Sequence, residues 1–325
     1  MESHIRKKLL EAFAKAGDDY ISGQKIAELT GTSRTAVWKH IESLKQDGYQ
    51  VEAVRKKGYK LIGTPGKMTA DTIRMALHSN TFGQDIYYFA QVDSTQKLAN
   101  ELANGGAKEG TIIVADEQTK GRGRLAREWY SPKYSGIWMS LICKPNIPIQ
   151  QAPQLTLLTA VAVAQAIEEV AEVSPFIKWP NDILLNGKKV TGILTELQAE
   201  ADRVHSIIIG IGMNVNQEQE DFPDELQNKA SSLRVEMGEI YPRERILASI
   251  LKHFEVLYFR YMEDGFSHIK QLWESYAISV GKKITATTIN DKIIGIALGI
   301  TDEGVLLIKD DHGQIHSIYS ADIEF

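Results

Sequence analysis

Apolar residues recur at helical spacing in the first part of the chain and predict three short helices, over about 5–13, 22–29 and 34–47. The apolar residues of the third helix share one face: Val37, Ile41 and Leu44. A short turn, Thr30-Gly31-Thr32, joins the second and third helices and predicts a helix-turn-helix. Trp38 is interpreted as a core residue, with a DNA contact as the alternative.

Two strand-like runs, 51–54 and 59–62, flank a basic turn and complete the pattern of a winged helix. Polar and basic residues occupy the start of the third helix and the wing tip, where they could reach base edges or phosphates. The predicted DNA-binding residues are Ser33, Arg34, Thr35, Lys39, Arg55, Lys56 and Lys57. The alternative is a protein-interaction module on which these charges are only solvated.

From residue 69 the pattern alternates between strands and longer helices, which indicates a central α/β domain with a mixed sheet. Strands are expected over 85–89, 111–115, 136–143, 176–178, 183–185, 192–197 and 204–211. Helices are expected over 69–78, 93–102, 151–170, 242–263 and 268–276. After residue 277 only short strands separated by turns remain, typical of a small β-barrel or an inert cap. The predicted domains are 1–63, a linker 64–68, 69–276 and 277–325.

Composition adds few constraints to this multidomain α+β picture. The 325 residues are 43% hydrophobic and 24% charged, as in ordinary globular proteins, and suffice for two or three domains. The single cysteine, Cys143, excludes an internal disulfide, fits a reducing cytosol and is expected to be buried. The longest apolar run, 155–167, is interrupted by polar residues and is expected to form a buried helix, so no membrane association is predicted.

Charge is distributed unevenly along the chain. Residues 1–63 hold 12 Lys and Arg against 8 Asp and Glu, a balance of +4. Since the whole chain carries −5, the rest carries −9. A basic N-terminal domain on an acidic body indicates a local nucleic-acid contact.

The run Gly121-Arg122-Gly123-Arg124 follows a predicted strand and has the composition of a loop that wraps an anionic ligand. Glycines leave the backbone approachable, and arginines supply forked donors for carboxylate or phosphate. A solvated loop or a nucleic-acid contact would explain the same four residues. The chain contains no Walker-type phosphate loop, which argues against a P-loop nucleotidase.

Further polar positions fall where strands end. Ser94 and Thr95 stand at a strand-to-helix junction and suit an uncharged polar ligand, although they could serve only as helix caps. Asn181-Asp182 ends a strand through a tight turn, and one lysine just past the Asn186-Gly187 turn could face the same ligand. The alternating glycines at 210 and 212 would let a ligand lie flat on their strand.

Taken in order, these motifs resemble the bacterial family of bifunctional biotin protein ligases that also repress biotin genes. The resemblance rests on Gly-Arg-Gly-Arg, Lys-Trp-Pro-Asn-Asp, Gly-Lys-Lys-Val-Thr-Gly-Ile-Leu and Gly-Ile-Gly-Met-Asn behind a winged helix, and it covers essentially the whole chain. It implies a central domain similar to class II synthetases and an SH3-like C-terminal barrel.

The resemblance also implies a reaction and a set of partners. Biotin and ATP, with Mg²⁺, would form biotinyl-5′-AMP, and biotin would pass to a lysine of the biotin carboxyl carrier protein of acetyl-CoA carboxylase and other biotin-dependent carboxylases. The adenylate would act as corepressor, favouring a homodimer that binds operator DNA of biotin genes in the cytoplasm. No protein ligands of Mg²⁺ are assigned.

Carried over by motif, the resemblance assigns two overlapping sets of residues. The biotin-binding set is Ser94, Thr95, Gln96, Gln118, Arg122, Gly123, Arg124, Lys189, Gly192 and Gly210. The ATP- and adenylate-binding set is Gly121, Arg122, Arg124, Arg127, Trp129, Asn181, Lys189 and Asn214. The expected catalytic residues are Arg122, Arg124 and Lys189, which would neutralise developing charge, and Asp182, which would orient the acceptor lysine. The chain departs from the family pattern at Ala126, where glycine is commoner.

Two other readings of the whole chain remain open at this stage. One is a metabolite-sensing repressor without catalysis, which would have no use for Lys189 or Asp182. The other is a lipoate-type ligase, a related fold that lacks the winged helix and the Lys-Trp-Pro-Asn-Asp stretch.

Overall fold

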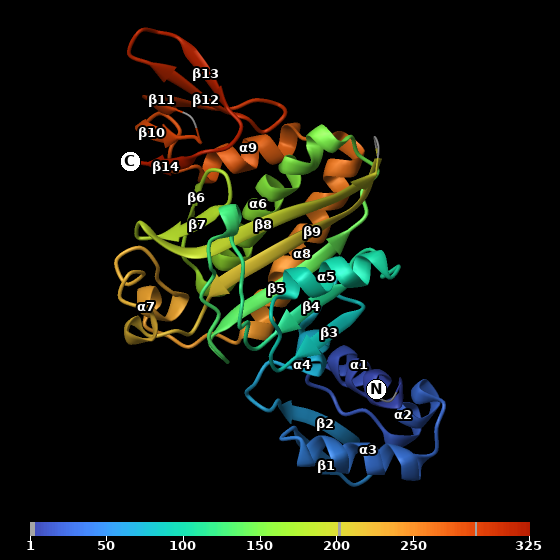
Figure 1. The fold of residues 1–325 in the computed structure, drawn as a ribbon. Helices are drawn as coiled ribbons and strands as arrows, with labels where there is room; N and C mark the ends of the chain where they lie inside the picture. The colour runs from blue at the N-terminus through green and yellow to red at the C-terminus, as the bar shows by residue number, and fades with distance from the viewer. Residues whose placement is uncertain (1–3, 201–202, 290) are drawn as a thin grey trace. The chain divides into compact units, whose positions relative to one another are not determined.

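The computed structural model describes residues 4–200, 203–289 and 291–325. These residues form two compact units, one ending at Leu77 and the other spanning His78–Phe325. Figure 1 shows the elements of both units. Each unit is described by itself below.

The first unit contains the predicted helix-turn-helix and wing. Its elements in chain order are α1 (His4–Ala16), α2 (Gly23–Thr30), α3 (Arg34–Gln46), β1 (Gln50–Val54), β2 (Gly58–Gly63) and α4 (Ala70–Ala76). Ser22 accepts a hydrogen bond from the Lys25 amide at 3.1 Å and Ser33 accepts one from the Ala36 amide at 3.2 Å. Both residues therefore cap their helices as the sequence predicts.

The interpretation of Trp38 as a core residue is wrong, because its side chain is 53% exposed. Val37, Ile41 and Leu44 are buried and form the inner face of α3, as predicted. One residue step turns an α-helix by about 100°. Trp38 therefore lies off the inner face and points to solvent.

Helix α4 packs within the first unit, although the Pro-Gly stretch at 65–66 suggested a linker before it. Thr69 caps α4, and the 4%-exposed Asp71 accepts a hydrogen bond from Arg6 Nε of α1 at 2.7 Å. A buried carboxylate needs such a partner. The compact units therefore divide after Leu77, whereas the domain limits drawn from the sequence stay predictions.

The second unit is built on a seven-stranded sheet with the order β3-β4-β5-β9-β8-β7-β6. Only β3 and β4 run parallel to each other, so the predicted mixed sheet is confirmed. The strands are β3 (Ile86–Phe89), β4 (Ile112–Ala115), β5 (Gly136–Cys143), β6 (Phe176–Lys178), β7 (Asp182–Leu185), β8 (Lys188–Glu200) and β9 (Arg203–Asn214). The last two strands extend beyond the predicted ranges because their polar ends interrupt the apolar alternation.

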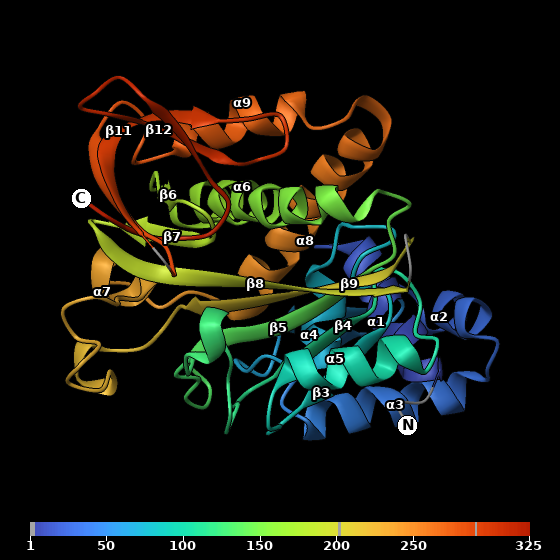
Figure 2. The same ribbon diagram turned by 45° about the horizontal axis from the view of Figure 1, so that its top comes forward.

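Helices cover both faces of this sheet. Figure 2 shows α5 (Thr95–Asn104) on one face and α6 (Ala152–Ala171) on the other. Helix α6 packs against α8 (Arg243–Asp264) and α9 (Ser267–Tyr276), and the short α7 (Leu233–Met237) precedes α8. Short 3₁₀ turns occur at Arg124–Ala126, Ile149–Gln151 and Gln219–Asp221.

The segment Ile149–Ala171 is the one helix of the described residues that is long and apolar enough to cross a membrane. Its most apolar window is 72% buried inside the protein. A helix that is apolar on all sides is expected in the core of a large domain. The prediction of a buried helix here is therefore confirmed.

A five-stranded antiparallel sheet ends the second unit and confirms the predicted small β-domain. Its order is β13-β12-β11-β10-β14. The strands are β10 (Lys283–Thr287), β11 (Lys292–Ile300), β12 (Leu306–Asp310), β13 (Ile315–Ile318) and β14 (Asp322–Glu324). Strand β14 was not predicted from the sequence, because three residues are too few to show an alternating pattern. The backbone of Ile278 donates to the carbonyl of Ile177 at 3.0 Å, which joins the segment before β10 to β6.

Thr191 of β8 offers a test of the energetics of this core. Its side chain is fully buried, and its hydroxyl has no hydrogen-bond partner among the described residues. Thr191→Val keeps the shape and removes the unpaired hydroxyl, so we expect the free energy of unfolding in urea to rise by about 1 kcal/mol. Thr159 is the matched control, because its buried hydroxyl donates to the Leu155 carbonyl at 2.6 Å. Thr159→Val should not stabilise, and equal effects of the two changes would contradict the prediction.

Candidate ligand-binding cavity

A cavity of about 800 Å³ opens beside the central sheet of the second unit. Its walls come from strands β5, β8 and β9, the loop around 122–130, the turn at 178–182 and the C-terminal residues 321–325. Fifteen of the predicted site residues line it: Ser94, Thr95, Gln96, Gln118, Arg122, Gly123, Arg124, Arg127, Trp129, Asn181, Asp182, Lys189, Gly192, Gly210 and Asn214. Positions far apart in the sequence therefore share one site.

Gly121 is the exception among the predicted residues of this unit. It is buried, and it is not among the residues that line the cavity. A Cβ at this position would lie 2.4 Å from the Trp129 carbonyl oxygen and 2.7 Å from Ser131 Oγ. Gly121 therefore permits a close backbone approach at the base of the loop.

An uncharged polar network forms one end of the cavity. Gln118 Oε1 accepts from the Thr95 amide at 2.8 Å. Thr95 Oγ1 lies 2.9 Å from Ser140 Oγ, which donates to Gln96 Oε1 at 3.0 Å. Ser94 Oγ is buried, makes no capping bond to α5 and has no hydrogen-bond partner in the described part of the chain. This end is preorganised for a neutral polar group, and Ser94 has a free hydroxyl to offer it.

Trp129 forms the middle of the cavity wall and packs on two glycines. A Cβ on Gly192 would lie 2.8 Å from its ring, and a Cβ on Gly212 would lie 2.4 Å from Nε1. A Cβ on Gly210 would meet Gln96 Oε1 at 2.7 Å. Side chains of the protein thus lie close to these glycines, which still line the cavity, and the expectation that a ligand lies flat on Gly210 and Gly212 stays a prediction. Because these glycines have no side chains, Trp129 and Gln96 can pack directly against the strands.

Lys189 joins the aromatic wall to the turn after β6. Its Nζ lies 2.7 Å from Asp182 Oδ1 and 5.2 Å from the centroid of the Trp129 ring. Both side chains of the ion pair are partly buried, with exposures of 31% and 20%. Lys188, the other lysine of the hairpin, is not among the lining residues. Of the two lysines after the hairpin turn, Lys189 is therefore the one that lines the cavity.

The arginines of the loop differ in their surroundings. Arg124 donates to Asn181 Oδ1 at 3.1 Å and to Ser320 Oγ at 2.8 Å. Burial lowers the pKa of Arg124, with Asp182 and Asp322 opposing that shift. Arginine titrates above about 12 in water, so this side chain stays a cation. Arg122 also faces the cavity but is exposed.

The loop itself is ordered as a small hairpin. The Gly123 amide donates to the Arg127 carbonyl at 2.8 Å, and the Trp129 amide donates to the Gly121 carbonyl at 3.0 Å. Ala126 has φ of +57°. A left-handed conformation costs a non-glycine residue about 1 kcal/mol, which explains why glycine suits this position. Alanine here makes the hairpin slightly strained.

Asn181 and Asn214 form hydrogen bonds that connect the segments around the cavity. Asn181 Nδ2 donates to the Ile193 carbonyl at 2.8 Å, which joins the turn after β6 to β8. Asn214 Nδ2 donates to the Ser231 carbonyl at 3.0 Å, and its Oδ1 accepts from Gln217 Nε2 at 3.0 Å. Because both amide groups are engaged by the protein, these residues position the walls of the cavity.

Several lining residues were not assigned from the sequence. Ser140 belongs to β5 and carries no motif. Asp322 and Phe325 come from the C-terminal residues and carry no motif. Asp322 pairs with Arg127, and that hydrogen bond lowers the pKa of the Asp322 carboxyl.

Within the described residues no group of three or more His, Cys, Asp and Glu side chains could hold a metal ion. Asp182 is the carboxylate beside Lys189, and the ammonium already occupies it. The described residues of the cavity therefore do not fit a resident metal bound by a cluster of carboxylates.

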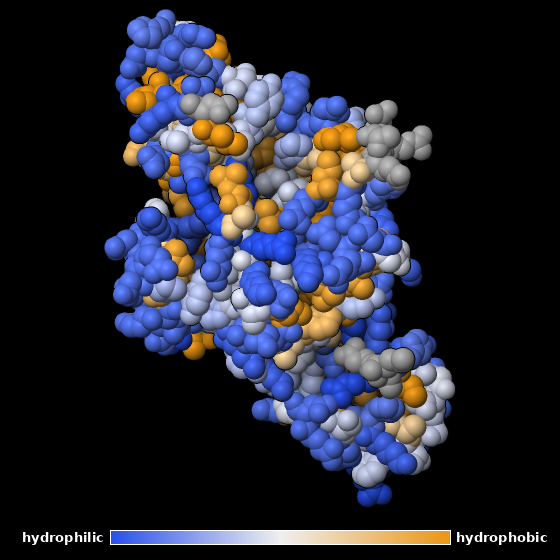
Figure 3. Space-filling view, viewed as in Figure 1, coloured by the Kyte–Doolittle hydropathy of each residue, from blue (hydrophilic) through white to orange (hydrophobic). Residues whose placement is uncertain are grey.

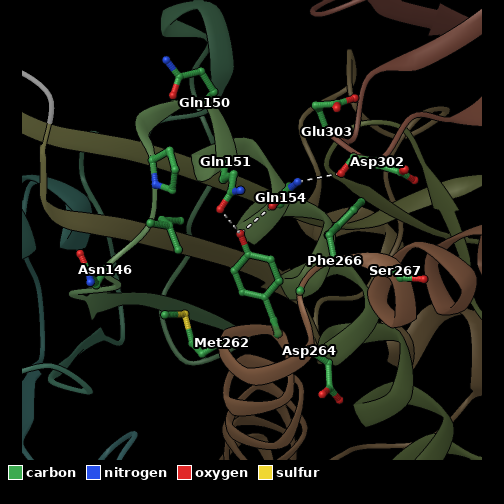
Figure 4. Close-up of a pocket in the computed structure, with 14 residues that line it drawn as sticks. Asn146, Gln150, Gln151, Gln154, Met262, Asp264, Phe266, Ser267, Asp302 and Glu303 are labelled. Carbon is green, nitrogen blue, oxygen red and sulfur yellow. Dashed lines mark hydrogen bonds between the residues drawn. The ribbon is translucent and has the colours of Figure 1, made fainter.

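A second cavity, of about 640 Å³, lies at the junction of α6, α8 and the C-terminal sheet (Figure 4). Tyr261 donates to Gln154 Oε1 at 2.6 Å, and Gln154 Nε2 donates to the Asp302 carbonyl at 2.8 Å. None of the predicted site residues lines it. Because these polar groups satisfy one another, the first cavity is the stronger candidate for a ligand.

Three family models match the chain. The biotin/lipoate A/B protein ligase family matches residues 88–214, an HTH domain matches 6–60, and the biotin protein ligase C-terminal domain matches 280–325. These ranges coincide with the central sheet, the first unit and the C-terminal sheet.

Comparison with individual proteins gives full-length similarity. The bifunctional ligase/repressor BirA of Bacillus subtilis is 57% identical over 324 residues, covering 100% of this chain and 99% of the relative. The biotin--[acetyl-CoA-carboxylase] ligase of Paracoccus denitrificans is 32% identical over 69% of this chain and 94% of its own length. The structure of the Aquifex aeolicus biotin protein ligase in complex with biotin and ATP has a TM-score of 0.65 at 32% identity, covering 74% of this chain and 99% of that one.

Proposed function

Because this chain belongs to the family of bifunctional biotin ligase/repressor proteins, we propose that its central cavity forms biotinyl-5′-AMP from biotin and ATP. The protein is a biotin ligase with a DNA-binding domain. The observation that carries the proposal is the polarity of one cavity: an uncharged hydroxyl and amide network at one end, and the cations Arg124 and Lys189 at the other.

The two ends suit the two halves of an acyl adenylate. The Thr95–Ser140–Gln96 network offers fixed polar partners to the uncharged ring system of biotin. The biotin carboxylate would then lie toward Lys189. Its oxygen would attack the α-phosphorus of ATP, and pyrophosphate would leave. Two anions meet in that step, so cations fixed in advance lower the barrier as charge develops. Mg²⁺ carried by the ATP phosphates would neutralise the leaving pyrophosphate.

In the second step the acceptor lysine attacks the mixed anhydride and AMP leaves. We propose that the acceptor is a lysine of the biotin carboxyl carrier protein of acetyl-CoA carboxylase, as the name of the Paracoccus relative suggests. The attacking amine must be neutral, and Asp182 lies beside the reaction centre in this arrangement. Its carboxylate is placed to orient the amine and to assist loss of the proton.

Asp182→Asn is expected to slow transfer from preformed biotinyl-5′-AMP by about 10²-fold, the usual contribution of a positioned acid or base. A single-turnover assay with purified carrier domain would measure it. Asp322→Asn is the matched control, since it changes a second cavity carboxylate that pairs with Arg127. Transfer at the wild-type rate in Asp182→Asn would contradict this role.

For regulation we propose that the adenylate acts as corepressor, that the adenylate-bound protein forms a homodimer, and that it represses biotin genes in the cytoplasm. The loop that carries Arg124 would couple adenylate binding to dimerisation. Contacts of Arg124 with the adenylate would order the loop, and the ordered loop would form part of the dimer surface.

Biotin-dependent exchange of labelled pyrophosphate into ATP tests the ligase proposal. Exchange is expected with biotin and not with lipoate. Exchange with lipoate instead would favour a lipoate-type ligase, and the absence of any exchange would leave a sensor without catalysis. Binding of biotin-gene DNA that strengthens with biotin plus ATP tests the repressor proposal.

A further inference from the structure

The exposed side chain of Trp38 is left unexplained by the ligase chemistry. It is 53% exposed on α3, the second helix of the helix-turn-helix. Isolated exposed apolar residues are common and need no special cause. Trp38 differs from such isolated residues in its position on the helix and in the charged residues near it in the sequence.

Trp38 shares a helix face with the residues expected to read DNA. It follows Arg34 by four residues and Thr35 by three, and such pairs are neighbours on an α-helix surface. Lys39 is the next residue, and all four side chains are exposed. In a helix-turn-helix the N-terminal residues of this helix face the base edges of the major groove. Trp38 is the fifth residue of α3.

The cations at the start of α3 and at the wing tip are available to phosphates. Among the described residues, the ion pairs include Lys45 with Glu42 and Lys60 with Asp18, but none engages Arg34, Lys39, Arg55 or Lys56. In the view of Figure 3 the surface of this unit is mostly hydrophilic. A large apolar ring among unpaired cations is complementary to DNA, which offers phosphates outside and apolar thymine methyl groups in the major groove.

We propose that Trp38 makes an apolar contact with a thymine methyl group in the major groove and so contributes to sequence specificity. This inference rests on the proposed repressor function. Arg34, Thr35 and Lys39 on the same face would contact neighbouring bases and phosphates, while Arg55 and Lys56 of the wing hold the backbone. A phosphate contact carries no sequence information, so the indole contact should affect specific binding and spare non-specific binding.

The test uses the full-length protein with biotin and ATP. A duplex that the wild type enriches from a random-sequence pool serves as the specific probe, and a scrambled duplex serves as the non-specific one. Each thymine of the specific probe is replaced in turn by uracil, which lacks only the methyl group. We expect the wild type to lose about fourfold in affinity at one position, the value of one buried methyl group.

Trp38→Ala should bind the specific probe about tenfold more weakly, bind the scrambled duplex within about twofold of the wild type, and show no loss at that uracil. Trp38→Phe keeps an apolar ring and should retain most of the affinity, which separates the contact from a folding defect. Leu29→Ala is the matched control, because Leu29 is 45% exposed on α2 and off this face. It should behave as wild type.

Wild-type affinity of Trp38→Ala for the specific probe would overturn the inference and leave the repressor proposal intact. So would a loss at the same uracil in both Trp38→Ala and the wild type. If the wild type enriches no sequence from the pool, the repressor proposal and this inference fall together.

Discussion

Lys189→Met is expected to lower kcat/KM for biotin-dependent pyrophosphate exchange by about 10³-fold. The ammonium lies 2.7 Å from Asp182 and above the ring of Trp129, inside the cavity that brings the proposed reactants together. Loss of one fixed donor to developing charge typically costs about 10²–10³-fold, and loss of a full cation in a shielded site lies at the upper end. Methionine keeps the length and apolar stem of the side chain, so the wall of the cavity should persist.

The neighbouring lysine supplies the control. Lys188→Met removes the same charge from the same hairpin, but Lys188 does not line the cavity and is within 3.5 Å of the Gln227 carbonyl. Its exchange rate should stay within about threefold of wild type. Lys189→Met alone leaves the Asp182 carboxylate without its ion-pair partner. The double variant Asp182→Asn/Lys189→Met removes that unpaired charge and is compared with the single variant. If Lys188→Met and Lys189→Met lose activity equally, general electrostatics explains the loss and Lys189 has no special role.

Arg124→Ala is expected to release biotinyl-5′-AMP about 10²-fold faster and to weaken DNA binding at a fixed biotin concentration. Arg124 connects the loop to the turn at Asn181 and to Ser320 of the C-terminal segment. A half-buried cation that also contacted the adenylate phosphate would hold both the loop and the ligand, and charge-assisted hydrogen bonds of this kind are the stronger ones. The loop would then exclude water from a mixed anhydride that hydrolyses readily.

Stopped-flow dissociation of the adenylate and titration of operator binding would measure the two effects in one preparation. Lys120→Ala is the control, because Lys120 is exposed in the same loop and is not among the lining residues. Faster release of the adenylate from Arg124→Ala without weaker DNA binding would show that the loop holds the adenylate but does not regulate DNA binding. An unchanged release rate would show that Arg124 has neither role.

Much of the fold could be predicted because its signals are local. The capping serines at 22 and 33, the Asn186-Gly187 hairpin turn and the buried face of α3 are all read from residues within one helical turn or one hairpin. The errors have local causes too. Trp38 was assigned to the core although its place on the helix surface points it outward, and the three-residue strand β14 is too short to show a period.

The site was predicted less completely, because its contacts join residues that are far apart along the chain. Gly210 and Gly212 were interpreted as a surface for a ligand, and the sequence did not show that Gly212 also lies against Trp129 and Gly210 against Gln96. Periodicity cannot show which side chain fills the space above a glycine. Gly121, assigned to the adenylate from its motif, lies against the Trp129 carbonyl, and its role toward the adenylate stays a prediction.

By itself the sequence determined the elements, the family and the chemical types of the site residues, since these depend on local spacing and on motifs in a recognisable order. The tertiary structure decided which of these residues meet. It placed Lys189 beside Asp182 and Trp129, packed Trp129 against Gly192 and Gly212, and brought Ser320 to Arg124 across 196 residues. The physical reason is that such contacts form only when strands and helices pack, and packing depends on the shape of the whole unit.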